Sequence, residues 1–98
     1  WKENIDQLRA KIDIIDENIL YALGSRMKIS RKIGEFKRDS NIAILQTSRW
    51  DAVLAKVIEK GAEYGLTEDF IKAVFNAIHE ASVEIQNEVI SGKTSVRK

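Results

Sequence analysis

Apolar residues recur at alternating spacings of three and four through the first third of the chain. The series consists of Ile5, Leu8, Ile12, Ile15, Ile19, Ala22, Ile29, Ile33 and Phe36. This spacing places the apolar side chains on one stripe of an α-helix. Isoleucine is abundant here and favours strands, but strict alternation of apolar and polar residues never occurs. The pattern therefore predicts one long helix over residues 3–38.

The next part of the chain predicts a loop and a second helix. Charged and polar residues cluster at 37–41, and a short apolar run follows at 42–45. Thr47 or Ser48 is a suitable N-cap for the second helix, because Ser and Thr side chains accept hydrogen bonds from free backbone N–H groups. Its apolar positions are Trp50, Val53, Leu54, Val57 and Ile58. Gly61 and Gly65 are candidates for its C-terminal end.

A third helix is predicted from Thr67 to the neighbourhood of Ser91 and Gly92. Thr67 is a candidate N-cap, and Glu68 and Asp69 place negative charge in the first turn, where the helix dipole favours it. The apolar positions that follow are Phe70, Ile71, Val74, Phe75, Ile78, Ala81, Ile85 and Val89. Residues 93–98 form a polar tail, which we expect to be frayed.

Composition supports an all-α fold of three helices. The 98 residues include no proline, although average usage of about 5% would place roughly five in a chain of this length. We expect a single helical domain over residues 1–92 followed by the tail. A first helix over 3–38 would be about 54 Å long, whereas a compact 100-residue domain has a radius of gyration near 13 Å. Its apolar stripe therefore needs a second chain, and we expect an intertwined homodimer.

Charge and cysteine content exclude several classes of function. The 16 Lys and Arg residues nearly balance the 15 Asp and Glu residues, which argues against a nucleic-acid partner. No apolar run approaches the ~18 residues of a membrane span, and no signal-peptide pattern precedes the first helix, so we expect a cytoplasmic protein without a membrane partner. With no Cys and one His, a thiolate nucleophile, a Ser/His/Asp triad and a metal cluster are improbable. We expect neither a metal nor a cofactor.

Cations interrupt the apolar stripe of the first helix. Arg26 takes the stripe position between Ala22 and Ile29, and burial of an unpaired guanidinium is costly. Lys37 is eleven residues further and returns to within about 20° of Arg26 around the helix. Arg9 lies near the same seam, but about 25 Å away along the axis. If two copies of the helix pack antiparallel, Arg9 of one chain lies between Arg26 and Lys37 of the other.

Polar residues also occupy apolar positions of the third helix. Ser82 lies between Ile78 and Ile85, Gln86 follows one turn later, and His79 precedes Ser82 by one turn. At the start of the second helix, Arg49 adds a cation. Each has an ordinary explanation: an arginine often reaches solvent or an acid, and a helical serine often bonds to the carbonyl four residues earlier. Together, four cations and two neutral donors suit a dianionic small ligand in an apolar pocket.

At these positions the chain resembles the all-helical (AroQ-class) chorismate mutases over roughly residues 4–90. The resemblance rests on LRAKIDIIDENIL (8–20), SRMKISRKIGEFK (25–37), TSRW (47–50) and ASVEIQ (81–86). The spaced set of Arg9, Arg26, Lys37, Arg49, Ser82 and Gln86 matches the active-site pattern of that family without gaps.

The resemblance implies an intertwined homodimer that rearranges chorismate to prephenate in aromatic amino-acid biosynthesis, without a cofactor. It implies that Arg26, Arg49 and Arg9, the last donated across the dimer, bind the substrate carboxylates. Ser82 matches a residue that contacts a carboxylate. Lys37 and Gln86 match the residues that donate hydrogen bonds to the ether oxygen, on which negative charge develops as the C–O bond breaks.

Two positions depart from the family pattern. Trp50 replaces an acidic residue that often contacts the substrate hydroxyl, and Gln46 replaces a common Asp but can still accept a hydrogen bond. Two alternatives to the mutase remain open. One is an isochorismate-pyruvate lyase. The other is a regulatory and dimerisation domain that binds prephenate or chorismate within a fused shikimate-pathway enzyme, such as a DAHP synthase or a prephenate dehydratase, which the start at Trp1 rather than Met supports.

Overall fold

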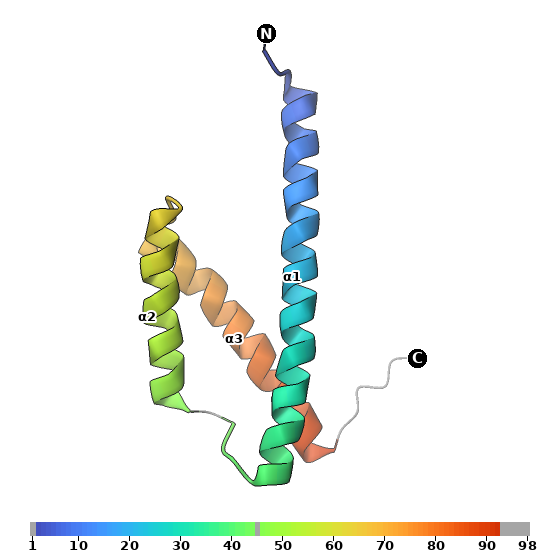
Figure 1. The fold of residues 1–98 in the computed structure, drawn as a ribbon, viewed down its shortest axis with the longest axis vertical. Helices are drawn as coiled ribbons and strands as arrows, with labels where there is room; N and C mark the ends of the chain where they lie inside the picture. Colours follow the sequence, from blue (N-terminus) through green and yellow to red (C-terminus); the bar gives the residue numbers. More distant parts are fainter. Residues whose placement is uncertain (1, 45, 93–98) are drawn as a thin grey trace.

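The chain forms three α-helices joined by two short connections (Figure 1). The computed structural model describes residues 2–44 and 46–92. Helix α1 comprises Ile5–Ser40, α2 Thr47–Glu63 and α3 Glu68–Ser91. The predicted all-α class with a long first helix is confirmed. The expected tail at 93–98, and Leu45 in the expected loop, lie outside the described residues.

Helix α1 is bounded by two asparagines that sequence analysis did not single out. The Asn4 side chain accepts a hydrogen bond from the Gln7 backbone N–H at 2.9 Å, and the Gln7 side chain accepts one from the Asn4 N–H at 3.0 Å. This capping box satisfies two donors that would otherwise lack partners. At the other end, Asn41 adopts the left-handed conformation, with φ of 59°. The helix therefore runs two residues later at both ends than the predicted range 3–38.

The predicted N-cap of α2 is wrong. Thr47 and Ser48 are already inside the helix, and the N-cap position belongs to Gln46, whose side chain makes no capping hydrogen bond. Gly61 does not end the helix either, because α2 continues to Glu63. A Cβ at Gly61 would lie 2.9 Å from the Ile71 side chain, so glycine is needed there for the packing of α3. Gly65 supplies the turn, with φ of 80°.

Helix α3 begins and ends as predicted. The Thr67 hydroxyl accepts a hydrogen bond from the Phe70 backbone N–H at 3.2 Å. At the C-terminal end, Gly92 is in the left-handed region with φ of 78°, a conformation that glycine adopts without steric cost. Both boundaries follow from local capping chemistry, which is why the sequence was sufficient to predict them.

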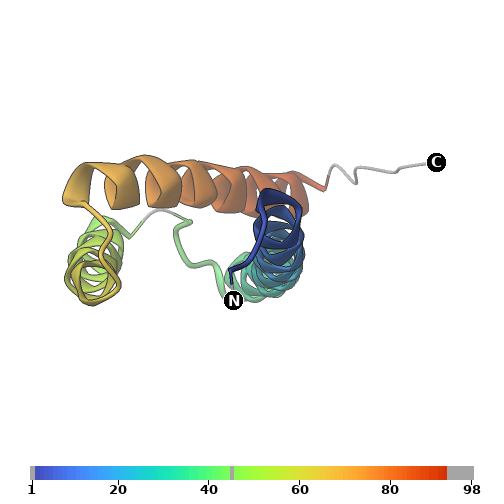
Figure 2. The same ribbon diagram turned by 90° about the horizontal axis from the view of Figure 1, so that it is seen from above.

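Helix α3 connects the other two helices. It packs against the C-terminal part of α1 and against α2, while α1 and α2 do not contact each other over the described residues. Viewed from above, α3 lies across both of them (Figure 2). The N-terminal half of α1 extends away from α2 and α3 (Figure 1). With a radius of gyration of 17.2 Å, the chain is more extended than the ~13 Å of a compact domain of this length.

The apolar stripe of α1 is not covered within one chain. Side chains that the heptad-like spacing places on one face are half exposed: Ile12 by 55%, Ile15 by 51% and Ile19 by 51%. Among the described residues, Ile71 is the one buried hydrophobic side chain, with 4% of its surface exposed. The architecture therefore leaves a large apolar surface on α1. None of the described helices is both long enough and apolar enough to span a bilayer.

Candidate functional site

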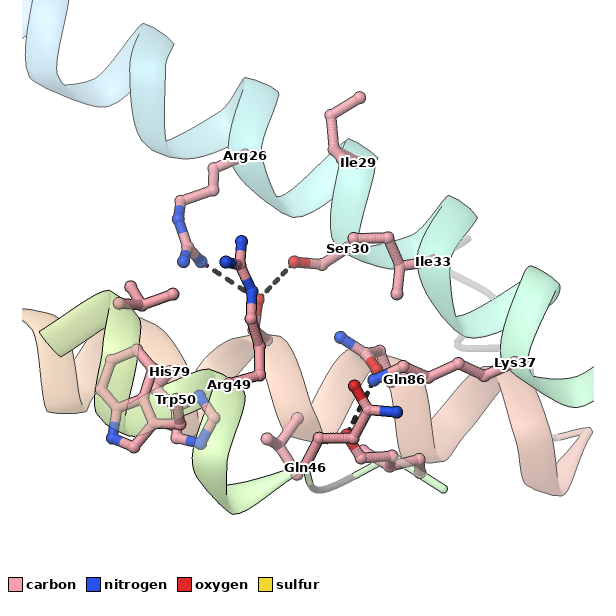
Figure 3. Close-up of a pocket in the computed structure, with 14 residues that line it drawn as sticks. Arg26, Ile29, Ser30, Ile33, Lys37, Gln46, Arg49, Trp50, His79 and Gln86 are labelled. Atoms are coloured by element: carbon pink, nitrogen blue, oxygen red, sulfur yellow. Dashed lines mark hydrogen bonds between the residues drawn. The ribbon is translucent and has the colours of Figure 1, made fainter. Parts of the chain in front are cut away.

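A cavity of about 350 Å³ lies between the C-terminal half of α1, the start of α2 and the middle of α3. All three helices contribute side chains to it (Figure 3). Its lining consists of Arg26, Ile29, Ser30, Ile33, Lys37, Ile44, Gln46, Arg49, Trp50, Val53, His79, Ser82, Val83 and Gln86. This volume lies in the range of small-molecule sites. Helices α1 and α2 run side by side without contacting each other over the described residues, and α3 crosses both (Figures 1 and 2).

One end of the cavity is held by a hydrogen-bonded cluster between α1 and α3. Ser30 and Ser82 are both buried, and their hydroxyls are hydrogen-bonded to each other. Arg26 Nη1 donates to Ser82 Oγ at 3.2 Å (Figure 3). The guanidinium is thus fixed by one of its five N–H groups, which leaves the others available for an anionic ligand. Arg26 does not simply reach solvent, and Ser82 does not merely bond to its own helix.

Lys37 holds the other end of the cavity. Its Nζ donates to the backbone carbonyl of Ile44 at 2.7 Å, which ties the connection after α1 to that helix. An ammonium has three donors, so two remain for other acceptors. Partial burial lowers the pKa of Lys37 from its usual value of 10.5. Because Lys37 follows Arg26 by eleven residues, both side chains project from the same side of α1 (Figure 3).

Gln86 is a buried amide with unused hydrogen-bonding capacity. Its side chain lines the cavity, and its Oε1 is buried without a hydrogen-bond partner. Gly34 of α1 lies against it: a Cβ at Gly34 would be 3.1 Å from the Gln86 Cα and 3.3 Å from its Cγ. Buried polar groups usually have partners. An unpaired one lining a cavity is therefore a candidate ligand contact.

Trp50 and His79 form an aromatic wall that joins α2 to α3. Their rings are stacked, with centroids 3.9 Å apart and an interplanar angle of 11°. Partial burial lowers the pKa of His79 from 6.5, and the positive charges of Arg26 and Lys37 lower it further, against the opposing effect of Glu80. The imidazole is therefore neutral at pH 7, and this wall carries no charge.

Six of the seven residues expected at the site line this one cavity. They are Arg26, Lys37, Gln46, Arg49, Ser82 and Gln86. Arg9 does not reach it within one chain: its side chain is 73% exposed and lies 4.0 Å from Asp6. No carboxylate is among the described residues that line the cavity. Over residues 2–44 and 46–92, no group of three His, Asp or Glu side chains is arranged to hold a metal ion.

Ser30 was not predicted from the sequence to line the site. A signal was present, because Ser30 follows Arg26 by four residues and therefore shares its helix face. The apolar lining residues from α2 and α3, Val53 and Val83, had no signal that distinguished them from core positions. His79, which precedes Ser82 by one turn, also lines the cavity.

Comparison with known proteins identifies the class to which this fold and cavity belong. The sequence profile described as chorismate mutase type II matches residues 8–87. The chain belongs to this family, which confirms the resemblance found in the sequence. The matched segment contains every residue of the cavity lining.

Curated relatives carry two kinds of name. The chain is 29% identical over 87 residues to a 4-amino-4-deoxychorismate mutase of Streptomyces pristinaespiralis, covering 89% of the chain and 67% of that protein. It is 34% identical over 96 residues to a bifunctional chorismate mutase/prephenate dehydratase of Aquifex aeolicus (strain VF5), covering 98% of the chain but only 24% of that protein. These names indicate mutases, that is, isomerases, and do not favour a purely regulatory domain.

Proposed function

We propose that the cavity binds chorismate and catalyses its rearrangement to prephenate. The observation that carries this proposal is the chemistry of the lining: Arg26, Lys37 and Arg49 surround one small cavity whose described residues include no carboxylate. Chorismate carries two carboxylates, and arginine is suited to bind each of them in a bidentate manner. Membership of the chorismate mutase family supports the assignment.

The reaction needs no group that this lining lacks. In the rearrangement the ether C–O bond breaks and a C–C bond forms within one molecule, so no proton, nucleophile or electron carrier is exchanged. Arg26 and Arg49 hold the two carboxylates and so favour the folded conformer in which the reacting carbons approach each other. Ser82 adds a hydroxyl beside Arg26, and we assign contact with the ring substituent to Gln46, which lines the same cavity.

Lys37 and Gln86 are the proposed catalytic residues. Negative charge develops on the ether oxygen in the transition state, and fixed donors directed at it lower the barrier without reorganisation. Lys37 has two N–H groups left after its bond to Ile44. The NH2 group of Gln86, whose side chain lines the cavity, supplies the second donor, since an amide donates through its nitrogen. Because glutamine does not titrate, its contribution is independent of pH.

We further propose that the working enzyme is a homodimer in which each site is completed by Arg9 of the partner subunit. The exposed stripe on α1 supports a second copy as its cover, since half-exposed isoleucines at helical spacing are unfavourable in water. In an antiparallel pair centred near the middle of α1, Arg9 of one copy faces the segment between Arg26 and Lys37 of the other. Each site then gains a further cation.

Steady-state chorismate turnover in Lys37→Ala and Arg9→Ala variants tests these assignments. Each substitution should lower kcat/KM by two or more orders of magnitude. Mixed Arg9→Ala and Lys37→Ala chains should regain activity, because half of the sites in a heterodimer contain both intact residues. An inactive wild-type chain would contradict the catalytic assignment. Absence of recovery after demonstrated subunit exchange would contradict the shared site.

We also propose that the enzyme is cytoplasmic. The bifunctional relatives support a fused prephenate dehydratase partner by analogy, since the chain spans about a quarter of the Aquifex aeolicus protein. A fused DAHP synthase partner rests on the family resemblance alone. An isochorismate-pyruvate lyase would bind a similar dianion. Isochorismate assayed beside chorismate separates the two, because a lyase releases pyruvate and a mutase does not.

A further inference from the structure

The charged side chains of the described cavity lining are all positive. Arg26 and Lys37 enter from α1 and Arg49 from α2, while the described lining residues provide no Asp or Glu. The acids nearest in sequence to the wall residues, Asp51 and Glu80, are exposed and are not part of the lining. In a cavity of about 350 Å³, any bound group lies within a few ångströms of at least one cation.

The aromatic and amide part of the lining carries no counter-charge. Trp50 and His79 are parallel and in contact, and both line the cavity together with the amide of Gln46. The stack covers one face of the indole, which reduces the surface available for a cation–π contact. The imidazole of His79 is neutral because burial, Arg26 and Lys37 all lower its pKa. A neutral imidazole and an amide each carry both a donor and an acceptor that suit a hydroxyl, but neither provides a counter-charge for an ammonium.

The difference between a hydroxyl and an ammonium matters because the names of the relatives indicate two substrates, one with a hydroxyl and one with an amine at ring position 4. We propose that the carboxylate-free lining, with the stacked Trp50–His79 wall and Gln46, makes this enzyme select the 4-hydroxy substrate, chorismate, over 4-amino-4-deoxychorismate. The inference rests on the proposed function. Its physical basis is that a protonated 4-amine adds a positive charge to a site that already holds three and loses its hydration without gaining an ion pair.

The direct test compares kcat/KM for both substrates on the intact wild-type chain at pH 7. We expect chorismate to be preferred at least tenfold. The preference should narrow at higher pH as the substrate amine loses its proton. Deprotonation of Lys37 acts in the same direction, because it removes one of the cations that disfavour an ammonium. Equal use of both substrates, or preference for the amine, would overturn the inference.

Substitution of a neutral lining residue by an acid tests whether the cavity lining causes the selection between the two substrates. Gln46→Glu is nearly isosteric and places a carboxylate in the lining, so it should reduce the preference for chorismate at least fivefold. Ala55→Glu adds the same charge to an exposed position of α2 outside the lining and should change the ratio less than twofold. Equal shifts in both variants would show that the selection is not made in this cavity.

The outcomes separate this inference from the proposed function. Turnover of chorismate without discrimination leaves the mutase assignment intact and overturns only the selection. Failure to convert either substrate overturns both. Helix content by circular dichroism checks that Gln46→Glu and Ala55→Glu are folded before their ratios are compared.

Discussion

The Ser82 hydroxyl has one proton and two lone pairs, and two protein side chains already form hydrogen bonds with it. Ser82 accepts from Arg26 at 3.2 Å and is bonded to Ser30. If Ser30 is the donor in that pair, the Ser82 proton is left for a ligand carboxylate, because Ser82 then accepts twice. Ser30 is thereby a positioning residue: it touches Ser82 and determines where the Ser82 proton points.

Replacement of Ser30 by alanine should weaken substrate binding more than catalysis. Ser82 would lose one hydrogen bond, worth about 1 kcal/mol, and KM should rise about fivefold with little change in kcat. Steady-state kinetics measure the two separately. Ser48→Ala, which removes an exposed hydroxyl from α2, serves as the control and should leave both constants unchanged. A fall in kcat without a change in KM would contradict the positioning role.

The pH dependence of activity should report Lys37. Burial lowers its pKa below 10.5, so the ammonium loses its proton, and kcat/KM falls, at a lower pH than for an exposed lysine. A bound dianion favours the charged form and should move the corresponding limb of kcat to higher pH. A Lys37→Arg variant keeps its charge and should lack this limb, however low its activity. An unchanged limb in that variant would assign it to another group.

At the scale of the helices, the close approach of α1 to α3 at Gly34 sets the position of Gln86. A methyl group at Gly34 would meet the Gln86 backbone at 3.1 Å, and backbone atoms cannot move aside without shifting a helix. The crossing point of two helices thus coincides with a proposed catalytic side chain. Glycine at this position couples helix packing to the geometry of the site.

Gly34→Ala and Gly24→Ala form a matched pair for this coupling. Both add a methyl group to the interior of α1, where alanine is favoured over glycine by about 0.5–1 kcal/mol. Nothing lies within 4 Å of a Cβ at Gly24, so that variant should unfold a few degrees higher and stay fully active. Gly34→Ala should not show this rise in unfolding temperature, and its kcat should fall at least tenfold. The unfolding temperature and kcat should be measured for both variants. Equal activities of the two variants would contradict the coupling between helix packing at Gly34 and the geometry of the site.

For the molecule as a whole, the exposed stripe on α1 has a thermodynamic consequence. Burial against a second copy stabilises the folded state by mass action, so the unfolding temperature should rise with protein concentration. Sedimentation should give twice the 11.1 kDa mass of one chain. Ile15→Asp should abolish both effects, because an unpaired carboxylate would be buried in the interface. Lys28→Asp, at an exposed polar position of α1, is the control. A concentration-independent monomer would contradict the dimer.

Periodicity and local chemistry were sufficient to predict much of this architecture. The spacing from Ile5 to Phe36 predicted α1, and Thr67 and Gly92 predicted the ends of α3. The helical repeat also placed Arg26 and Lys37 on one side of α1. The start of α2 was predicted wrongly because two hydroxyl residues follow Gln46, and a strong cap residue inside a helix looks the same in sequence as one at its boundary.

Contacts between different helices could not be predicted from the sequence. Ser30 and Trp50 acquire their surroundings only where α1 and α2 cross α3, and no spacing along a single helix predicts which residues meet across a crossing. The stack of Trp50 on His79 joins residues of two different helices for the same reason. The position of Arg9 in a complete site depends on a second chain and remains a prediction.

The placement of α3 across both other helices also has a kinetic consequence. Helix α2 and α3 are adjacent in sequence and pack locally, so their association closes only a short loop and should be fast. In the proposed dimer, the stripe of α1 is covered only after a second chain binds. After dilution from denaturant, helix content should therefore return at a rate independent of protein concentration, while activity returns at a rate that increases with it.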